Sequence, residues 1–181
     1  MQVEDITDYQ SGEWLTRGTV WLALVLYVWG ELALARRREG AVSGFVAVRW
    51  LQSLAWAAFL AHIACAFQFY HHWSHAHALA DTARQTAERV GWNWGGGLWF
   101  NYLFAALWTG EIGWAWFDLE GYRNRAIWMV RSVRAFFFFM IFNGAVLFAP
   151  GPQRWLGLLL CAALAWAWRP TRHLARFPDK S

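Results

Sequence analysis

Residues 46–70 read VAVRWLQSLAWAAFLAHIACAFQFY, and this stretch decides the fold class. Arg49 is its only arginine, lysine, aspartate or glutamate. A helix that crosses a bilayer needs roughly 20 consecutive, mostly apolar residues, and this segment exceeds that length. The segment is therefore predicted to be a transmembrane helix.

The composition of the whole chain agrees with that prediction. Hydrophobic residues make up 58% of the 181 positions and charged residues 15%. Ordinary soluble domains contain roughly 45–50% and 25%, respectively. Such a composition excludes a disordered chain and a soluble nucleic-acid-binding domain, and two cysteines exclude a disulfide scaffold. We expect an integral membrane protein whose first partner is the lipid bilayer.

Four further apolar stretches accompany this segment and predict a bundle of five transmembrane helices. No repeat or low-complexity linker divides the chain, so residues 1–181 are expected to form one all-α transmembrane domain. The predicted spans are 16–35, 46–70, 97–117, 126–149 and 155–168.

The distribution of basic residues predicts the orientation of this bundle. They cluster after the first predicted span, before the fourth and after the fifth, which would all lie on one side. By the positive-inside rule this side is cytoplasmic, so the N-terminus lies outside and the C-terminus inside. We expect a bacterial-type inner membrane, with the histidine-rich loop in the periplasm. The basic residues are Arg36, Arg37, Arg38, Arg123, Arg125, Arg169, Arg172, Arg176 and Lys180.

The long outer loop between the second and third spans contains a predicted amphipathic helix at 74–90. Ser74 could cap its start, and Gly91 suits the position just past its end. A helical period brings its alanines, Leu79 and Val90 onto one apolar face, which we expect to pack on the bundle. The helix would then be a cap, or a lid over an outward-facing site. The predicted apolar face comprises Ala76, Leu79, Ala80, Ala83, Ala87 and Val90.

A histidine cluster is the sharpest chemical feature of the sequence. His71, His72 and His75 form an HHxxH pattern at the outer end of the second span. If the helix continues through them, they share an arc of about 100° with Gln68 and could ligate one metal ion. Neutral imidazole suits Cu, Zn or Fe, so these are the metals that we expect. The alternative is that these are interfacial histidines that only form hydrogen bonds.

His62 lies deeper in the same predicted helix, roughly 12 Å below its outer end. An intramembrane histidine is a candidate functional residue, and we include it as a tentative metal ligand. Cys65 and Cys161 could complete a soft site for copper. Haem b held by two histidines is disfavoured, because no other predicted span contains a histidine.

Ionisable residues also occur near the inner ends of the spans. Buried charges in a membrane must pair, so we expect Glu31 to pair with Arg49, and Glu111 with Arg131 or Arg134. The set could be a structural belt of ion pairs with snorkelling arginines. The functional alternatives are a proton pathway or a site for an anionic headgroup.

Two asparagines provide a further polar set in the outer half of the bundle. Asn101 and Asn143, with Gln68 and His62, could line one cavity that opens outward. Asparagines also join helices by hydrogen bonds inside membranes, which is the structural alternative.

Three functions follow from these residues. The first is a metal-binding or redox-associated membrane protein that uses the outer histidines. The second is a non-catalytic subunit that binds a membrane-protein partner or a second copy of the chain. The third is a small proton-coupled permease that uses Glu111 and the arginines. The sequence has no GxSxG, HExxH, P-loop or GxGxxG motif, so no enzymatic reaction is assigned.

Overall fold

The computed structural model describes residues 3–36 and 42–169, with side chains for 10–36 and 45–169. Within these ranges the chain is all-helical and has no strand. Five of the basic residues that predicted the orientation lie outside the described residues: Arg37, Arg38, Arg172, Arg176 and Lys180.

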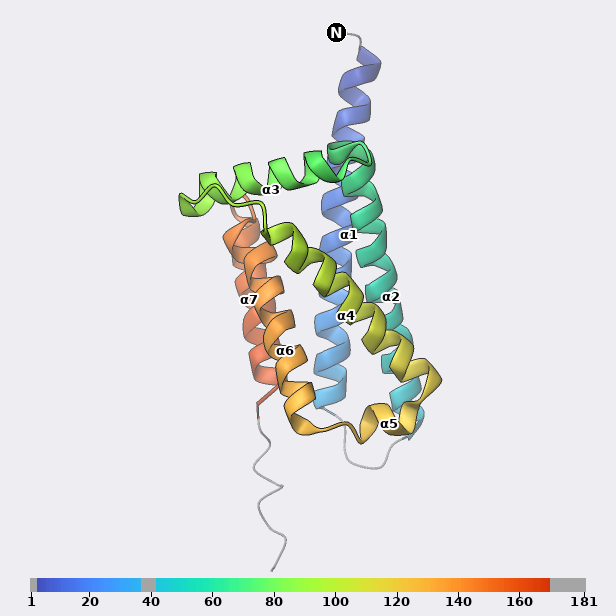
Figure 1. Ribbon diagram of the computed structural model, residues 1–181. Helices are drawn as coiled ribbons and strands as arrows, with labels where there is room; N and C mark the ends of the chain where they lie inside the picture. Colours follow the sequence, from blue (N-terminus) through green and yellow to red (C-terminus); the bar gives the residue numbers. More distant parts are fainter. Residues whose placement is uncertain (1–2, 37–41, 170–181) are drawn as a thin grey trace, which may run out of the picture.

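In the described residues, α1, α2, α4, α6 and α7 run up and down the molecule and are called here the long helices, whereas α3 and the short helix α5 lie across its ends (Figure 1). The helix α3 crosses one end, called here the α3 end, and α5 lies at the other, the α5 end. The helix bounds are α1 Val3–Ala35, α2 Val42–Ala66, α3 His75–Val90, α4 Gly97–Phe117, α5 Leu119–Arg123, α6 Ile127–Phe142 and α7 Gln153–Ala167. The π-helical turns η1 Phe67–His71 and η2 Asn143–Leu147 extend α2 and α6.

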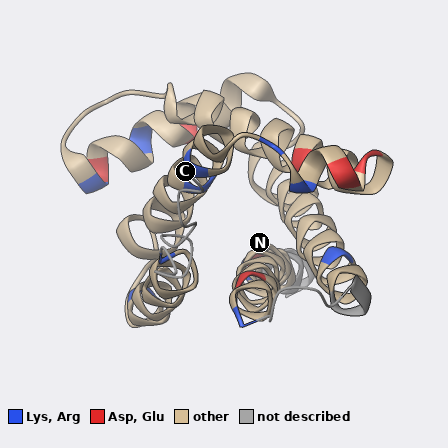
Figure 2. Cartoon of the chain, turned by 90° about the horizontal axis from the view of Figure 1, so that it is seen from below, with Lys and Arg blue, Asp and Glu red and all other residues tan. Residues whose placement is uncertain are grey.

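The long helices form a closed circuit of contacts. In chain order, α1 contacts α2, α2 contacts α4, α4 contacts α6, α6 contacts α7, and α7 returns to α1. Figure 2 looks along this bundle from the α5 end and shows that most of the ribbon is uncharged. Side chains that point inward from this circuit are therefore enclosed by all five helices.

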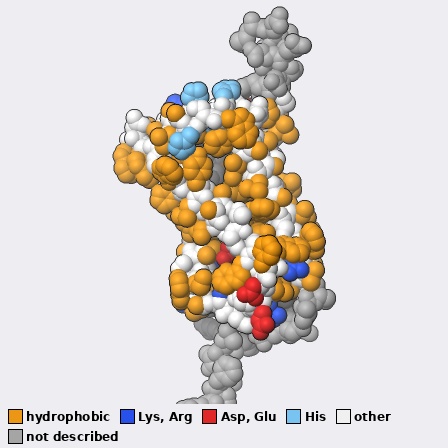
Figure 3. All heavy atoms as spheres, turned by 45° about the vertical axis from the view of Figure 1, so that its right-hand side comes forward, with side chains coloured by type: hydrophobic (Ala, Val, Ile, Leu, Met, Phe, Trp, Pro, Cys, Tyr) orange, Lys and Arg blue, Asp and Glu red, His pale blue; other side chains and the backbone are white. Residues whose placement is uncertain are grey.

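In the part of the chain that the structure describes, three helical stretches are long and apolar enough to cross a membrane: Gln10–Ala35, Phe45–His71 and Ile127–Leu147. The helix of Gln153–Ala167 is apolar but shorter. Large apolar side chains such as Trp14, Phe117 and Leu159 are exposed on the bundle. On the face seen in Figure 3, apolar side chains cover the middle, histidines lie near one end and acidic groups near the other. These features indicate a location in a membrane.

Aromatic side chains fill the centre of the bundle. Trp108 of α4 and Phe137 of α6 are each only 2% exposed. The ring centroid of Trp108 lies 5.2 Å from that of Tyr27 and 5.0 Å from that of Phe59. The Phe104 ring lies 4.7 Å from Phe137 in an edge-to-face arrangement. We call Tyr27, Phe59, Phe104, Trp108 and Phe137 the aromatic plug.

The 100° arc of histidines depends on one helix that continues from α2 through the cluster, and this condition is not met. The turn η1 ends at His71, and His72 and Trp73 then adopt left-handed conformations with φ of 47° and 56°. Ser74 accepts a hydrogen bond from the His77 backbone N–H and caps the next helix. His71 and His75 therefore belong to different helical segments, so the predicted 100° arc does not exist.

The predicted packing face of α3 is also wrong. Ala76, Leu79, Ala80 and Val90 are exposed and Ala83 and Ala87 are only half-buried, whereas the buried positions are Ala78 and Thr86. The Thr86 hydroxyl donates to the Thr82 carbonyl of its own helix, and Thr82 does the same to Ala78. Because their hydroxyls are satisfied locally, these threonines pack as small side chains against α4 and η1.

Candidate functional site

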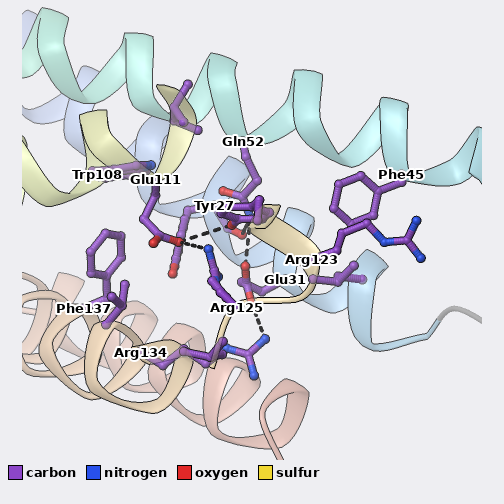
Figure 4. Close-up of a pocket in the computed structure, with 15 residues that line it drawn as sticks. Tyr27, Glu31, Phe45, Gln52, Trp108, Glu111, Arg123, Arg125, Arg134 and Phe137 are labelled. Atoms are coloured by element: carbon purple, nitrogen blue, oxygen red, sulfur yellow. Dashed lines mark hydrogen bonds and ion pairs between the residues drawn. The ribbon is translucent and has the colours of Figure 1, made fainter. Parts of the chain in front are cut away.

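A cavity of about 300 Å³ opens among the helices at the α5 end (Figure 4). We call it the α5-end cavity. Its walls carry five charged groups from four helical elements and the segment after α5, together with Tyr122 and apolar side chains. Its polar and charged lining residues are Glu31, Gln52, Glu111, Arg123, Arg125 and Arg134.

Glu111 pairs with Arg125 in this cavity. The Arg125 Nη1 lies 2.8 Å from Glu111 Oε2, and both side chains are less than a fifth exposed. The N–H does not point along this line, so within the described residues Arg125 Nη1 makes an ion pair but no hydrogen bond. Tyr122 donates its hydroxyl proton to the same oxygen at 3.2 Å, and Arg125 lies 3.8 Å from the Tyr122 ring centroid. Glu111 is thus held by one cation and one hydroxyl.

Glu31 accepts hydrogen bonds from three other helical elements. Trp168 Nε1 donates to Oε2 at 2.6 Å, and Arg134 Nη2 approaches the same oxygen at 3.4 Å. Gln52 Nε2 donates to Oε1 at 3.2 Å. These contacts join α1 to α2, to α6 and to the end of α7 through one carboxylate, which is only 13% exposed.

The predicted ion pairs therefore have different partners in the structure. Arg49 does not pair with Glu31; its Nη1 donates to the carbonyl of Ala115 at 3.4 Å, and its guanidinium lies 4.0 Å from the Trp116 ring centroid. Arg49 faces the carboxyl end of α4, where free carbonyl groups attract a cation. Arg131 is exposed and does not line the α5-end cavity. Arg134 pairs with Glu31 instead of Glu111.

Gln52 leaves an acceptor unused in the wall of the cavity. Its Nε2 donates to Glu31 and to the Tyr27 carbonyl, and these two acceptors fix the orientation of the amide. The Oε1 is buried and has no hydrogen-bond partner among the described residues. A Cβ at Gly30 would lie only 2.5 Å from Gln52 Nε2, so the glycine makes room for this side chain.

Two groups at the mouth of the cavity complete its electrostatics. Arg123 lies 5.7 Å from the Phe45 ring centroid and has no carboxylate partner among the described residues. Burial raises the pKa of Tyr122 to about 12, and the nearby charge of Glu111 raises it further than the Arg125 charge lowers it. Tyr122 thus stays neutral at physiological pH, and the cavity holds one cation more than its carboxylates neutralise.

A second cavity, of about 270 Å³, lies toward the α3 end. We call it the α3-end cavity. It is more apolar than the first, and its polar lining residues are Arg17, His62, Asn101 and Gln153.

His62 has a fixed tautomer at the edge of the α3-end cavity. Its Nδ1 lies 2.8 Å from the Thr16 carbonyl oxygen. A carbonyl only accepts, so Nδ1 carries the proton and a neutral His62 keeps Nε2 as an acceptor. The prediction that His62 and Asn101 line one outer cavity agrees with this arrangement.

The other two residues of that prediction do not line this cavity. The Gln68 Oε1 accepts from Trp73 Nε1 at 2.9 Å, which braces the turn after α2. The Asn143 amide donates to the Phe139 carbonyl of its own helix at 2.7 Å, where the α-helix gives way to η2.

The two cavities lie on opposite sides of the aromatic plug, and Trp108 lines both. On α2, Gln52 faces one cavity and His62 the other, ten residues away. On α4, Asn101 and Glu111 are also ten residues apart and face the two cavities. At 1.5 Å per residue, each pair is separated by about 15 Å. The bundle thus has a charged cavity on one side of a short apolar barrier and, on the other side, a largely apolar cavity that also contains Arg17, His62, Asn101 and Gln153.

The histidines of the predicted metal site have separate partners. His71 Nδ1 lies 3.2 Å from Asp81 Oδ2, and His75 Nδ1 lies 3.0 Å from the Tyr102 hydroxyl. In the part of the chain that the structure describes, no group of three or more His, Cys, Asp or Glu residues could hold a metal ion. The spacing HHxxH was a weak signal because it assumed an unbroken helix.

Several residues of the α5-end cavity were not singled out from the sequence. Arg123 and Arg125 were used only as indicators of orientation, and Gln52 and Tyr122 were not considered. Tyr122 lies in the short helix α5 and Arg125 follows it, so the direction of α5 sets where their side chains lie. The sequence signal available for them was their position immediately before the fourth predicted span.

Comparison with family models, with curated proteins and with solved structures finds no match for this chain.

Proposed function

We propose that this protein is a small multi-pass permease that moves protons together with a solute across a membrane. The observation that carries the proposal is that Trp108 lines two cavities that lie toward opposite ends of the bundle, each with charged or polar groups in its wall. A protein that moves a solute needs access from each side and a barrier between them. The aromatic plug is such a barrier, and rotation of a few of its side chains would change how far it separates the two cavities.

We propose that all five long helices cross the bilayer. The helix α4 has 21 residues, about 31 Å at 1.5 Å per residue, which matches a hydrocarbon core of roughly 30 Å. Its place in the closed circuit supports this topology, since α4 lies between α2 and α6. The arginine-rich α5 end is then cytoplasmic, as the positive-inside rule favours for a bacterial-type inner membrane.

Glu111 is the group that we assign to the proton. It pairs with Arg125 and accepts from Tyr122, while Glu31, Arg123 and Arg134 share its cavity. A proton on Glu111 removes its attraction for Arg125 and frees that guanidinium for another anion. Proton uptake and solute binding would therefore occur in the same cavity, which is a requirement for coupled movement.

Proton flux into proteoliposomes tests the proposal. Vesicles loaded with a pH-sensitive dye and potassium receive purified protein, and valinomycin then sets a membrane potential that is negative inside. We expect the wild-type protein to acidify the lumen, and the Glu111→Gln variant to fall to the rate of protein-free vesicles. Glu120→Gln is the matched control, because Glu120 lies exposed on α5 at the same end.

Two results would overturn the proposal that this protein is a permease. One is wild-type flux that equals that of protein-free vesicles, both with and without the soluble extract of cells as a source of solute. The other is equal flux in Glu111→Gln and Glu120→Gln vesicles. Circular dichroism and size-exclusion profiles of each variant establish that the protein is folded before flux is compared.

A second candidate is a subunit that binds a membrane-protein partner or a second copy of the chain through α3. The observation in its favour is the exposed apolar face of that helix, which includes Leu79 and Val90. Crosslinking in membranes from cysteines placed at these two positions tests it. A stable crosslinked product supports this candidate. The candidate is contradicted if neither cysteine variant forms a crosslink.

The hypothesis of a metal-binding or redox-associated protein depends on His71, His72, His75 and His62. Their separation in the fold gives it no geometric support, and elemental analysis for Cu, Zn and Fe tests it directly. Stoichiometric metal that is lost in a His71→Ala, His75→Ala double variant would favour it over the permease.

A further inference from the structure

We infer that the α5-end cavity binds a small organic oxyanion that also carries a hydroxyl or amine donor. This inference names the solute class of the proposed permease and rests on that proposal only for the transport step. Binding itself follows from the charges and unused hydrogen-bonding groups of the cavity.

The cationic excess of the cavity favours an anion. Glu111 neutralises Arg125 and Glu31 neutralises Arg134, whereas Arg123 has no carboxylate partner among the described residues and contacts the Phe45 ring. An arginine guanidinium binds phosphate and carboxylate through paired N–H groups, which a lysine cannot do. The guanidinium of Arg123 at the mouth is thus the first contact that we assign to the ligand.

The two paired arginines retain donors for the same anion. The Arg125 Nη1 has no hydrogen bond among the described residues, although it lies beside Glu111. The contact between Arg134 and Glu31 is long, at 3.4 Å, and the Arg134 side chain is about a third exposed. Figure 4 shows Arg125 beside Glu111, Arg134 near Glu31, and Arg123 to one side of them, pointing toward Phe45.

The remaining walls determine what the anion carries. The buried Gln52 Oε1 is an acceptor without a partner among the described residues, so it would receive a proton from a hydroxyl or amine of the ligand. Leu34, Phe45, Ile112 and Val133 provide apolar surface around this polar group. A buried acceptor without a hydrogen bond is unfavourable, and a donor on the ligand would remove this cost. Inorganic phosphate has no carbon skeleton to contact these apolar side chains.

A phosphate group next to a hydroxyl can come from two sources. One is a soluble ester such as glycerol phosphate, and the other is the headgroup of phosphatidylglycerol at the cytoplasmic surface. Both present the same chemistry to Arg123 and Gln52, so the experiment is designed to separate them.

The test measures binding and not transport. Detergent-solubilised full-length protein is titrated with glycerol phosphate, with glycerol and with inorganic phosphate, and binding is followed by calorimetry. In parallel, thermal unfolding is measured in nanodiscs with and without phosphatidylglycerol. We expect saturable binding of glycerol phosphate, or stabilisation by phosphatidylglycerol, and at least tenfold weaker binding of glycerol.

Two variants tie the binding to this cavity. Arg123→Gln should weaken binding about tenfold, which is the effect of losing one charged hydrogen bond. Arg131→Gln is the matched control, because Arg131 is exposed and lies outside the cavity lining. Gln52→Leu should weaken the binding of glycerol phosphate more than the binding of inorganic phosphate. Gln52→Asn, which keeps an amide oxygen, should lose less affinity for glycerol phosphate than Gln52→Leu does.

The outcomes separate this inference from the permease. Glycerol phosphate binding that depends on Arg123 assigns a soluble solute, and an Arg123-dependent effect of phosphatidylglycerol alone assigns a lipid headgroup. The inference is overturned if neither binds, or if Arg123→Gln and Arg131→Gln behave alike. A protein that binds the anion but carries no protons would overturn the permease and leave the binding site standing.

Discussion

The indole N–H of Trp168 donates a 2.6 Å hydrogen bond to Glu31 Oε2, across 137 positions of the sequence. The contact connects the end of α7 to α1 and closes the circuit of helices. It also explains how a carboxylate is tolerated near the end of a membrane-embedded helix, because Gln52 and Arg134 supply the other donors.

Replacing Trp168 with Phe should destabilise the bundle. The ring is kept, but Glu31 loses a hydrogen bond, and bonds to charged groups contribute about 1.5–3 kcal/mol. Thermal unfolding in detergent, followed by helix content, should show a lower midpoint than the wild type. Trp128→Phe is the control, since Trp128 is 67% exposed. Equal midpoints for the two variants would contradict a role for this contact in stability.

Replacing Gly157 with Ala should separate α7 from η2. A Cβ at Gly157 would clash with the backbone carbonyl oxygen of Ala145, so the two backbones must move apart. Such overpacking typically costs about 1–3 kcal/mol. Gly110→Ala is the matched control, because a Cβ there meets nothing within 4 Å. Chemical denaturation in micelles should therefore give a clearly lower free energy of unfolding for Gly157→Ala than for Gly110→Ala. The opposite order would refute the close approach of α7 to η2.

Replacing Trp108 with Ala should join the two cavities. Removing so large a buried ring costs about 3–5 kcal/mol, so the variant must first be shown to be folded. In the same vesicles as above, we expect a proton leak that no longer depends on Glu111, measured with the double variant Trp108→Ala, Glu111→Gln. Trp99→Ala on the same helix is the control, because Trp99 is exposed. A leak that still requires Glu111 would show that Trp108 is not the barrier.

The pKa of Tyr122, raised by burial to about 12, makes stability depend on alkaline pH. In the unfolded chain tyrosine has a pKa of about 10. Between pH 10 and 12 the unfolded state loses this proton while the folded state keeps it, so the free energy of unfolding falls as pH rises. Below pH 10 the contribution is constant.

The measurement for Tyr122 is a spectroscopic titration of tyrosinate in the wild type and in Tyr122→Phe. The difference between the two curves should titrate near pH 12. A difference curve centred near pH 10 would mean that Tyr122 is not shielded from solvent as the structure describes.

The helices followed from local properties of the sequence. The stretch 46–70 lies within α2 and η1 because a long apolar run must form its own backbone hydrogen bonds to leave water. The helix at 74–90 was predicted almost to the residue, since Ser74 and Gly91 are capping residues whose effect depends only on neighbouring atoms. The Asp118 cap of α5 was not expected, although its side chain accepts from the Gly121 N–H in the same local way.

The partners of the charged residues required the tertiary structure. The depth of Glu31, Glu111 and the arginines along their helices was readable from the sequence, and it indicated a polar layer near one end. Helix rotation and the direction of α5 decided that Glu111 meets Arg125 and that Arg49 turns to the Ala115 carbonyl. A rotation of 100° per residue means that a shift of one position changes every partner.

The sequence by itself therefore determined that this is an apolar, helical chain with polar groups at two depths. Only the tertiary structure decided that these groups line two cavities separated by Trp108, and that the histidine helix breaks at His72. The physical reason is that burial and capping act between neighbours in the chain, whereas a cavity is defined by helices that are distant in sequence.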